Sequence, residues 1–94
     1  MDNFYRFYLS QHSNKVCRRL HFIGTLLAIV SLLIIIFLSQ YKLLYAPIIM
    51  GYLPAWIGHF FFEKNKPATF KFPMKSFFCD FRMFFDILKG KIPW

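Results

Sequence analysis

The chain has 94 residues, which is enough for one domain and too few for two. Hydrophobic residues make up 57% and charged residues 17%, which excludes a disordered tail. An ordinary soluble domain is also disfavoured, because so short a chain cannot bury that much apolar surface around its own core. The net charge of +8 suits nucleic acid or an anionic membrane surface. Only Lys42 is charged between residues 20 and 62, so the cations bracket an apolar centre and we expect no nucleic-acid partner.

The first long apolar run covers residues 20–38 and follows a short aromatic segment, residues 3–11, that we expect to form an N-terminal helix. The run's nineteen residues would give about 28 Å of helix at about 1.5 Å each, close to the hydrocarbon thickness of a bilayer. It predicts a transmembrane helix. A signal peptide is disfavoured, because more apolar sequence follows in place of a small-residue cleavage site.

A second predicted span, residues 43–62, has no formal charge although it carries two prolines and two glycines. Membrane helices tolerate proline where neighbours satisfy the freed carbonyls. Only residues 39–42 join the two spans, which predicts an antiparallel hairpin with both ends on one side of the bilayer. Because the joining loop holds only Lys42 and both flanks are basic, we expect both termini in the cytoplasm. In a bacterial cell this would be the inner (plasma) membrane.

The last predicted element is an amphipathic helix over residues 74–89. Its apolar face collects Phe77, Phe78, Phe81, Phe84, Phe85 and Leu88, with Lys75, Arg82, Asp86 and Lys89 opposite. Asp80 lies at the border of the phenylalanine face, away from the other charges. Such a helix belongs at a membrane surface or against the hairpin. The sequence therefore predicts one all-α integral membrane domain, residues 1–94, in which a two-span transmembrane hairpin is flanked by a short N-terminal helix and a C-terminal amphipathic helix.

The three histidines all fall at the predicted cytoplasmic end of the hairpin. His12 precedes the first span, His21 lies in its first turn and His59 lies in the last turn of the second. Polar side chains at the margin of an apolar bundle are costly without partners, which makes them functional candidates. Local hydrogen bonding at the interface would explain any one of them, whereas their shared location favours a common site. Because His12 and His21 are nine residues apart, the chain must bend near Asn14 for both to point inward.

Three neutral imidazoles beside a carboxylate favour zinc, iron or copper over magnesium or calcium, and two histidines with one carboxylate are typical of non-haem iron(II) oxygenases. Glu63 stands four residues after His59 and would share its face on a continuing helix. The candidate metal ligands are therefore His12, His21 and His59, with Glu63 or Asp80 as a candidate fourth ligand or second-shell partner.

Three separated stretches, residues 7–14, 19–25 and 57–70, carry a family resemblance in both order and spacing, and it continues through Pro73 to residues 79–86. These motifs closely resemble those of the family of small membrane proteins that includes the fungal 2-hydroxy fatty acid dioxygenase. The chain is similar to the short bacterial-type members of that family.

The resemblance implies a membrane-embedded, iron(II)-dependent dioxygenase that shortens 2-hydroxy fatty acids by one carbon in α-oxidation. His12, His21 and His59 fall in the motifs of the family's iron-binding histidines, which implies that they are both catalytic and metal-binding. A long-chain 2-hydroxy fatty acid would chelate Fe(2+) through its hydroxyl and carboxylate, with O2 as co-substrate. Candidate partners for that carboxylate are Lys15, Arg18 and Arg19, although positive-inside anchoring also explains these cations.

Two interpretations from other classes stay open. A non-enzymatic small membrane scaffold, whose histidines cap helices, would have neither a metal nor a pocket. A lipid-binding protein would keep the pocket and lose the metal. Two spans offer little wall for an enclosed pocket, which favours a homo-oligomer, although no pair of glycines four residues apart supports one.

Overall fold

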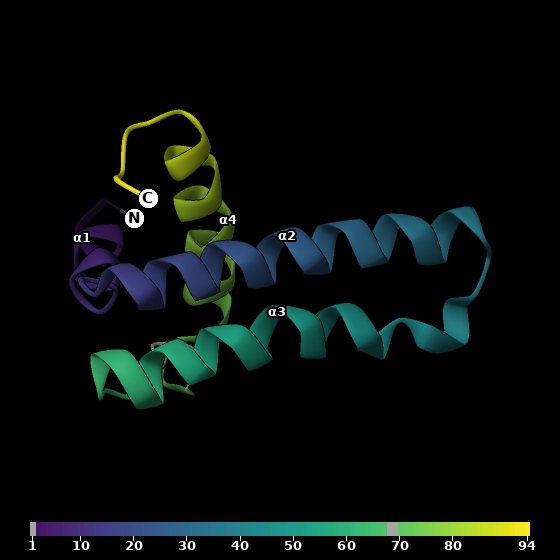
Figure 1. Cartoon of the computed structure of the whole chain (residues 1–94), viewed down its shortest axis with the longest axis horizontal. Helices are drawn as coiled ribbons and strands as arrows, with labels where there is room; N and C mark the ends of the chain where they lie inside the picture. The colour runs from purple at the N-terminus through teal and green to yellow at the C-terminus, as the bar shows by residue number, and fades with distance from the viewer. Residues whose placement is uncertain (1, 68–69) are drawn as a thin grey trace.

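The computed structural model describes residues 2–67 and 70–94, so Ala68 and Thr69 of the third resembling stretch lie outside the described residues. Within those ranges every element is helical, which confirms the predicted all-α class (Figure 1). The elements in chain order are α1 (Asp2–Ser10), α2 (Lys15–Phe37), the 3₁₀ turn η1 (Tyr41–Leu43), α3 (Tyr45–Ile57), the π-helical turn η2 (Gly58–Glu63) and α4 (Pro73–Leu88).

Helices α2 and α3 form an antiparallel hairpin that η1 closes at its far end (Figure 1). The helical segments Lys15–Phe37 and Tyr41–Glu63 are each 23 residues long and apolar enough to cross a membrane, by length and composition. Large apolar side chains stand out from this hairpin. Leu33 is 61% exposed, Phe37 86% and Ile48 61%. Exposed apolar side chains of this size favour a surface that meets something other than water.

Asn14 determines where α2 begins. Its Oδ1 accepts hydrogen bonds from the backbone N–H of Val16 at 2.8 Å and of Cys17 at 3.2 Å, as an N-cap does. Its own N–H donates to the carboxylate of Glu63, which ties the start of α2 to the end of η2. The cap starts α2 several residues before the predicted span and separates it from α1 at the expected bend.

Glycine residues allow α2 and α3 to approach each other closely. A Cβ atom added to Gly24 would lie 2.5 Å from the carbonyl oxygen of Gly51, and one on Gly58 would lie 2.9 Å from Cα of Cys17. Real Cβ atoms do not come that close to backbone, so these two positions exclude any side chain. The Gly58–Cys17 contact holds the start of α2 against η2, and the Gly24–Gly51 contact holds α2 against α3. Together they bring the segments that carry His21 and His59 close to each other.

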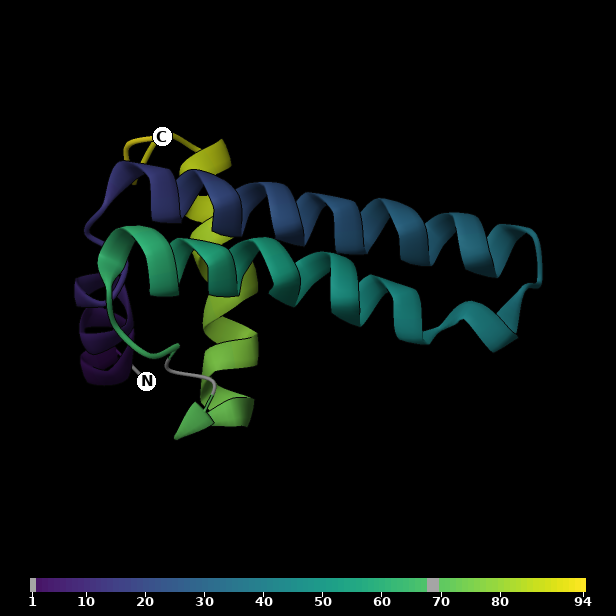
Figure 2. The same cartoon turned by 60° about the horizontal axis from the view of Figure 1, so that its bottom comes forward.

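Helix α4 crosses the hairpin near the end where α1 and both termini lie (Figures 1 and 2). It does not pack through its phenylalanine face as a whole. Phe77, Phe78 and Phe85 are 44%, 56% and 48% exposed, whereas Phe84 is buried and stacks on Phe22 of α2. The buried residues of α4 are Ser76, Cys79, Asp80, Met83, Phe84 and Ile87. The position of Asp80 away from the other charges therefore reflects its place on the packed face.

The Gly24–Gly51 contact generates a stability prediction, because a Cβ on Gly51 would lie 3.4 Å from Cβ of Ala28 and 3.8 Å from the carbonyl oxygen of Gly24, which are van der Waals distances. We expect Gly24→Ala to lower the free energy of unfolding by about 1–3 kcal/mol through overpacking. Gly51→Ala should be neutral or stabilising, because alanine is the better helix former. Thermal unfolding of the two purified variants makes the comparison, and equal losses would contradict this account of the contact.

Candidate metal centre

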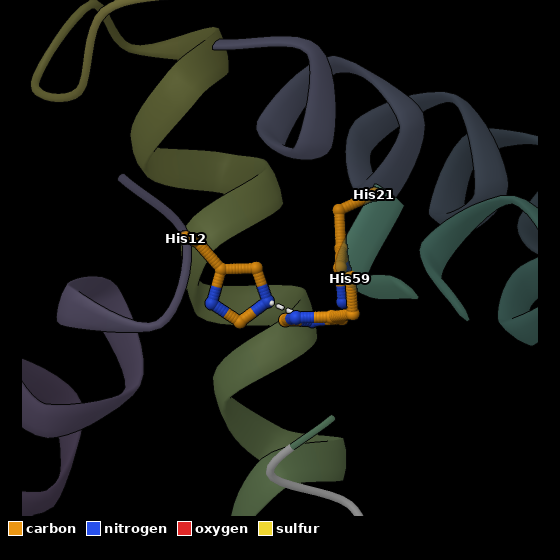
Figure 3. Close-up of side chains that lie close together, drawn as sticks. All are labelled: His12, His21 and His59. Carbon is orange, nitrogen blue, oxygen red and sulfur yellow. Dashed lines mark hydrogen bonds between the residues drawn. The ribbon is translucent and has the colours of Figure 1, made fainter. Parts of the chain in front are cut away.

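Three buried histidines meet at the end of the hairpin where α1 and α4 lie (Figure 3). His12 comes from the connection between α1 and α2, His21 from α2 and His59 from η2, and their exposed fractions are 1%, 6% and 1%. One candidate ligand atom from each lies within 4.8 Å of the other two. The structure thus brings together the three histidines that the sequence singled out.

A backbone carbonyl fixes the tautomer of His12. Its Nδ1 lies 2.6 Å from the carbonyl oxygen of Tyr8, one turn earlier in the chain. Because a carbonyl oxygen only accepts, Nδ1 carries the hydrogen and Nε2 keeps its lone pair. Burial, with a smaller contribution from His59, lowers the pKa of His12 to about 3. His12 is therefore a neutral imidazole at neutral pH, with Nε2 free to bind a cation.

Asn65 fixes the tautomer of His59 in the same way. Lys64 ends η2 in the left-handed conformation, with φ of 60°, and so turns the chain back toward His59. The Asn65 Oδ1 then lies 2.8 Å from Nδ1 of His59. The Asn65 amide donates to the backbone carbonyl of Gln11 at 3.3 Å and to its side-chain oxygen at 3.0 Å, which assigns the amide orientation. Nδ1 of His59 is accordingly the donor, and Nε2 again keeps its lone pair.

The Nε2 atoms of His12 and His59 lie 2.9 Å apart (Figure 3). With both Nδ1 atoms acting as donors, two lone pairs face each other at that distance, and neutral imidazoles repel in this geometry. A cation between them removes the repulsion, and imidazole nitrogens are common ligands of first-row transition metals. The donor set therefore fits such a metal.

Asp80 stands behind His21. Its Oδ1 lies 3.6 Å from Nδ1 of His21, and it accepts a hydrogen bond from the Tyr8 hydroxyl. Burial raises the pKa of the Asp80 carboxyl to about 7, and the Tyr8 hydrogen bond partly opposes that rise. A carboxylate beside a histidine ring can orient that ring. Asp80 thus contacts His21 from outside the three-histidine cluster.

Glu63 does not join the histidine cluster. Its carboxylate accepts from the backbone N–H of Asn14 and from the Ser13 hydroxyl at 3.2 Å. The expectation that it shares a face with His59 assumed a continuing α-helix, whereas η2 is a π-helical turn with i to i+5 bonding. Residues four apart no longer align there. Glu63 instead holds the start of α2 in place.

The cations considered for a substrate carboxylate are engaged elsewhere or exposed. Arg18 donates to the carbonyl oxygens of His12 at 3.1 Å, Ser13 at 2.9 Å and Pro93 at 3.2 Å. The Arg19 guanidinium lies 5.5 Å from the ring centroid of Trp94, and Lys15 is exposed. Arg18 thus holds the backbone that carries His12.

Sequence reasoning did not single out Tyr8 and Asn65 as site residues. Their contacts cannot be predicted from residue spacing. Tyr8 uses its backbone carbonyl, one turn before His12, and Asn65 reaches His59 only because Lys64 is left-handed and reverses the chain. Their place inside the resembling stretches 7–14 and 57–70 was the available signal.

These contacts generate a prediction for Asn65. Replacement by alanine frees Nδ1 of His59 and allows the ring to turn, so affinity for a divalent first-row metal should fall about 10- to 100-fold. Asn65→Asp keeps the accepting oxygen and should retain most of the affinity. Metal titration by calorimetry measures both variants. Equal affinities for wild type and Asn65→Ala would show that Asn65 does not position His59.

Comparison with known proteins places the chain in a family. A family model described as 2-hydroxy-palmitic acid dioxygenase Mpo1-like matches residues 1–92. Comparisons with curated proteins and with solved structures find no match. The matched range covers nearly the whole chain and includes all three histidines, in agreement with the resemblance found in the sequence. The chain therefore belongs to the Mpo1-like family.

Proposed function

We propose that this protein is an Fe(II)-dependent dioxygenase of the membrane that shortens long-chain 2-hydroxy fatty acids by one carbon. The family's description names such an activity on 2-hydroxy-palmitic acid. The observation that carries the proposal is the pair of unprotonated Nε2 atoms of His12 and His59, 2.9 Å apart, with His21 beside them. A buried cluster of this kind is costly to a protein unless a cation fills it.

In this proposal His12, His21 and His59 would hold the metal. Ferrous iron supplies the redox chemistry that lets dioxygen react with an organic acid. The Tyr8 carbonyl and Asn65 keep two imidazoles in the required tautomer, and Asp80 orients the third.

The overall reaction needs no added reductant. One 2-hydroxy acid and one O2 balance against the acid one carbon shorter, carbon dioxide and water. The bond between the carboxyl carbon and the hydroxyl-bearing carbon breaks, and these two carbons supply every electron that dioxygen takes up. An acid without the hydroxyl group cannot follow this balance and should not be consumed.

We further propose that the hairpin crosses the bilayer with both termini in the cytoplasm; in a bacterial cell the bilayer would be the inner (plasma) membrane. Both long helical segments meet the length and composition of a span, and their outward residues are apolar. The turn between them, residues 38–44, carries only Lys42, whereas cations gather on both flanks. Helix α4, which crosses the hairpin near one end, would lie along the membrane surface with its exposed phenylalanines in the lipid (Figure 2).

Single cysteines introduced on a Cys17→Ala, Cys79→Ala background test this topology. A cysteine at position 91 should react with a membrane-impermeant maleimide only from the cytoplasmic side, and one at position 42 only from the opposite side. Labelling of both positions from the same side would rule out the hairpin crossing.

The activity is tested on His59→Ala, with Phe61→Ala as a matched control from the same turn, where Phe61 is 70% exposed. Wild type and Phe61→Ala should bind iron and convert 2-hydroxypalmitic acid into the acid one carbon shorter. The His59→Ala variant should lose both, because the side chain that would bind the metal is gone. Iron content and product are measured on the same samples, with palmitic acid as the unreactive substrate.

Two outcomes would overturn the proposal. If His59→Ala keeps iron at the wild-type level, the histidines do not form its site. If wild type loaded with iron consumes no 2-hydroxy acid of any chain length, the protein is a scaffold or lipid-binding member of its family.

A further inference from the structure

A groove of about 410 Å³ leads away from the histidine cluster along the hairpin, between α2 and α3. Its polar end is formed by His21 and Asp80. From there it follows successive turns of α2 as far as Leu33 and the antiparallel turns of α3 as far as Leu44, so it covers about half the length of α2. Because His21 belongs to both, the groove and the proposed metal centre are continuous.

The lining is strongly asymmetric in polarity. Beyond His21 and Asp80, its polar side chains are Thr25 and Tyr52, and all other lining residues are apolar or glycine. Polar groups therefore gather toward one end, while the distal end is purely hydrocarbon. An occupant that complements this surface has a polar head and a long unbranched apolar chain.

The length of the groove fits one acyl chain. Leu33 stands twelve residues beyond His21, which is about 18 Å along a helix. One leaflet contributes about 15 Å of hydrocarbon to a bilayer about 30 Å thick. The groove thus has the length of a membrane acyl chain and lies on a helix pair that the proposed function places in the bilayer.

The close contact between the helices forms the base of the groove. Ala28 and Gly51 lie in its lining, and a Cβ on Gly51 would be 3.4 Å from Cβ of Ala28. The small residues there leave room for a chain that larger side chains would fill. Leu33 and Ile48, each 61% exposed, border the distal part and leave it open at the side.

We infer that this groove binds the hydrocarbon chain of the 2-hydroxy fatty acid, and that Ile48 and Leu33 at its distal part set the longest chain accepted. The inference rests on the proposed function and adds where the acyl chain lies and which residues limit its length. The hydroxyl and carboxylate lie at the His21 end. The chain enters sideways from the surrounding lipid, so the acid does not have to leave the bilayer to react.

The first test places a bulky side chain in the distal groove. Ile48 lines it and Ile49 does not, although both are exposed isoleucines of α3, at 61% and 54%. We expect Ile48→Trp to lower kcat/KM for 2-hydroxypalmitic acid about tenfold, the loss that follows when about two methylenes no longer fit. The same variant should leave 2-hydroxyoctanoic acid unaffected, and Ile49→Trp should change neither. The inference would be overturned if Ile48→Trp lowered kcat/KM equally for the short and the long acid, or if it lowered neither.

The second test does not depend on turnover. The full chain in phosphatidylcholine nanodiscs is irradiated with 2-hydroxypalmitic acid that carries a diazirine on its last carbon. Label should appear within residues 29–33 and 44–48, should be displaced by unlabelled 2-hydroxypalmitic acid, and should fall in Ile48→Trp but not in Ile49→Trp. Label elsewhere would refute the inference. Label in these segments that no 2-hydroxy acid displaces would also refute it, because the groove would then hold bilayer lipid.

The two tests separate this inference from the proposed function. If the label in the groove is displaceable but the protein consumes no acid, the groove binds the acyl chain and the proposed dioxygenase activity is wrong. If the protein turns over the acid but Ile48→Trp changes neither the chain-length preference nor the labelling, the dioxygenase activity stands and binding of the chain in the groove is wrong.

Discussion

The structure depends on one constraint, the approach of the His12 and His59 Nε2 atoms to 2.9 Å after both Nδ1 hydrogens have been used. Two imidazole lone pairs so close together favour a bound cation, and contacts on both sides keep the two rings in place. The Tyr8 carbonyl and the Asn65 amide hold the rings. The Gly24–Gly51 contact and the Asn14–Glu63 hydrogen bond hold the segments that carry them.

Most of the charged and polar groups near this centre make contacts that stabilise the fold. Glu63 accepts a hydrogen bond from the start of α2, and Arg18 donates to three backbone carbonyls. Asp80 accepts from Tyr8 and lies beside His21. The immediate surroundings of the metal in our proposal are therefore neutral imidazoles with an apolar groove beyond them. That combination suits an acid whose head binds a metal and whose chain remains in hydrocarbon.

The sequence predicted the elements whose signal is local. Apolar runs and charge distribution gave the helical class, and the location of His12, His21 and His59 at one end of the hairpin gave their convergence. It did not give the packed face of α4, because that face mixes Ser76 and Asp80 with apolar residues and does not stand out by polarity on a helical wheel. The face that Glu63 and His59 would share on a continuing α-helix does not form, since η2 is a π-helical turn and residue spacing does not signal one. The contact of Asn65 with His59 also has no local signal, because it depends on the left-handed conformation of Lys64.

X-ray absorption at the iron edge of the Fe(II)-loaded protein tests the central claim most directly. The account predicts the multiple-scattering pattern of three imidazoles with iron–nitrogen distances of about 2.1 Å, as for first-row metals bound by histidine. In a His12→Ala protein the pattern should fall to two imidazoles. A spectrum without imidazole scattering, or one that the substitution leaves unchanged, would contradict a metal centre built from His12, His21 and His59.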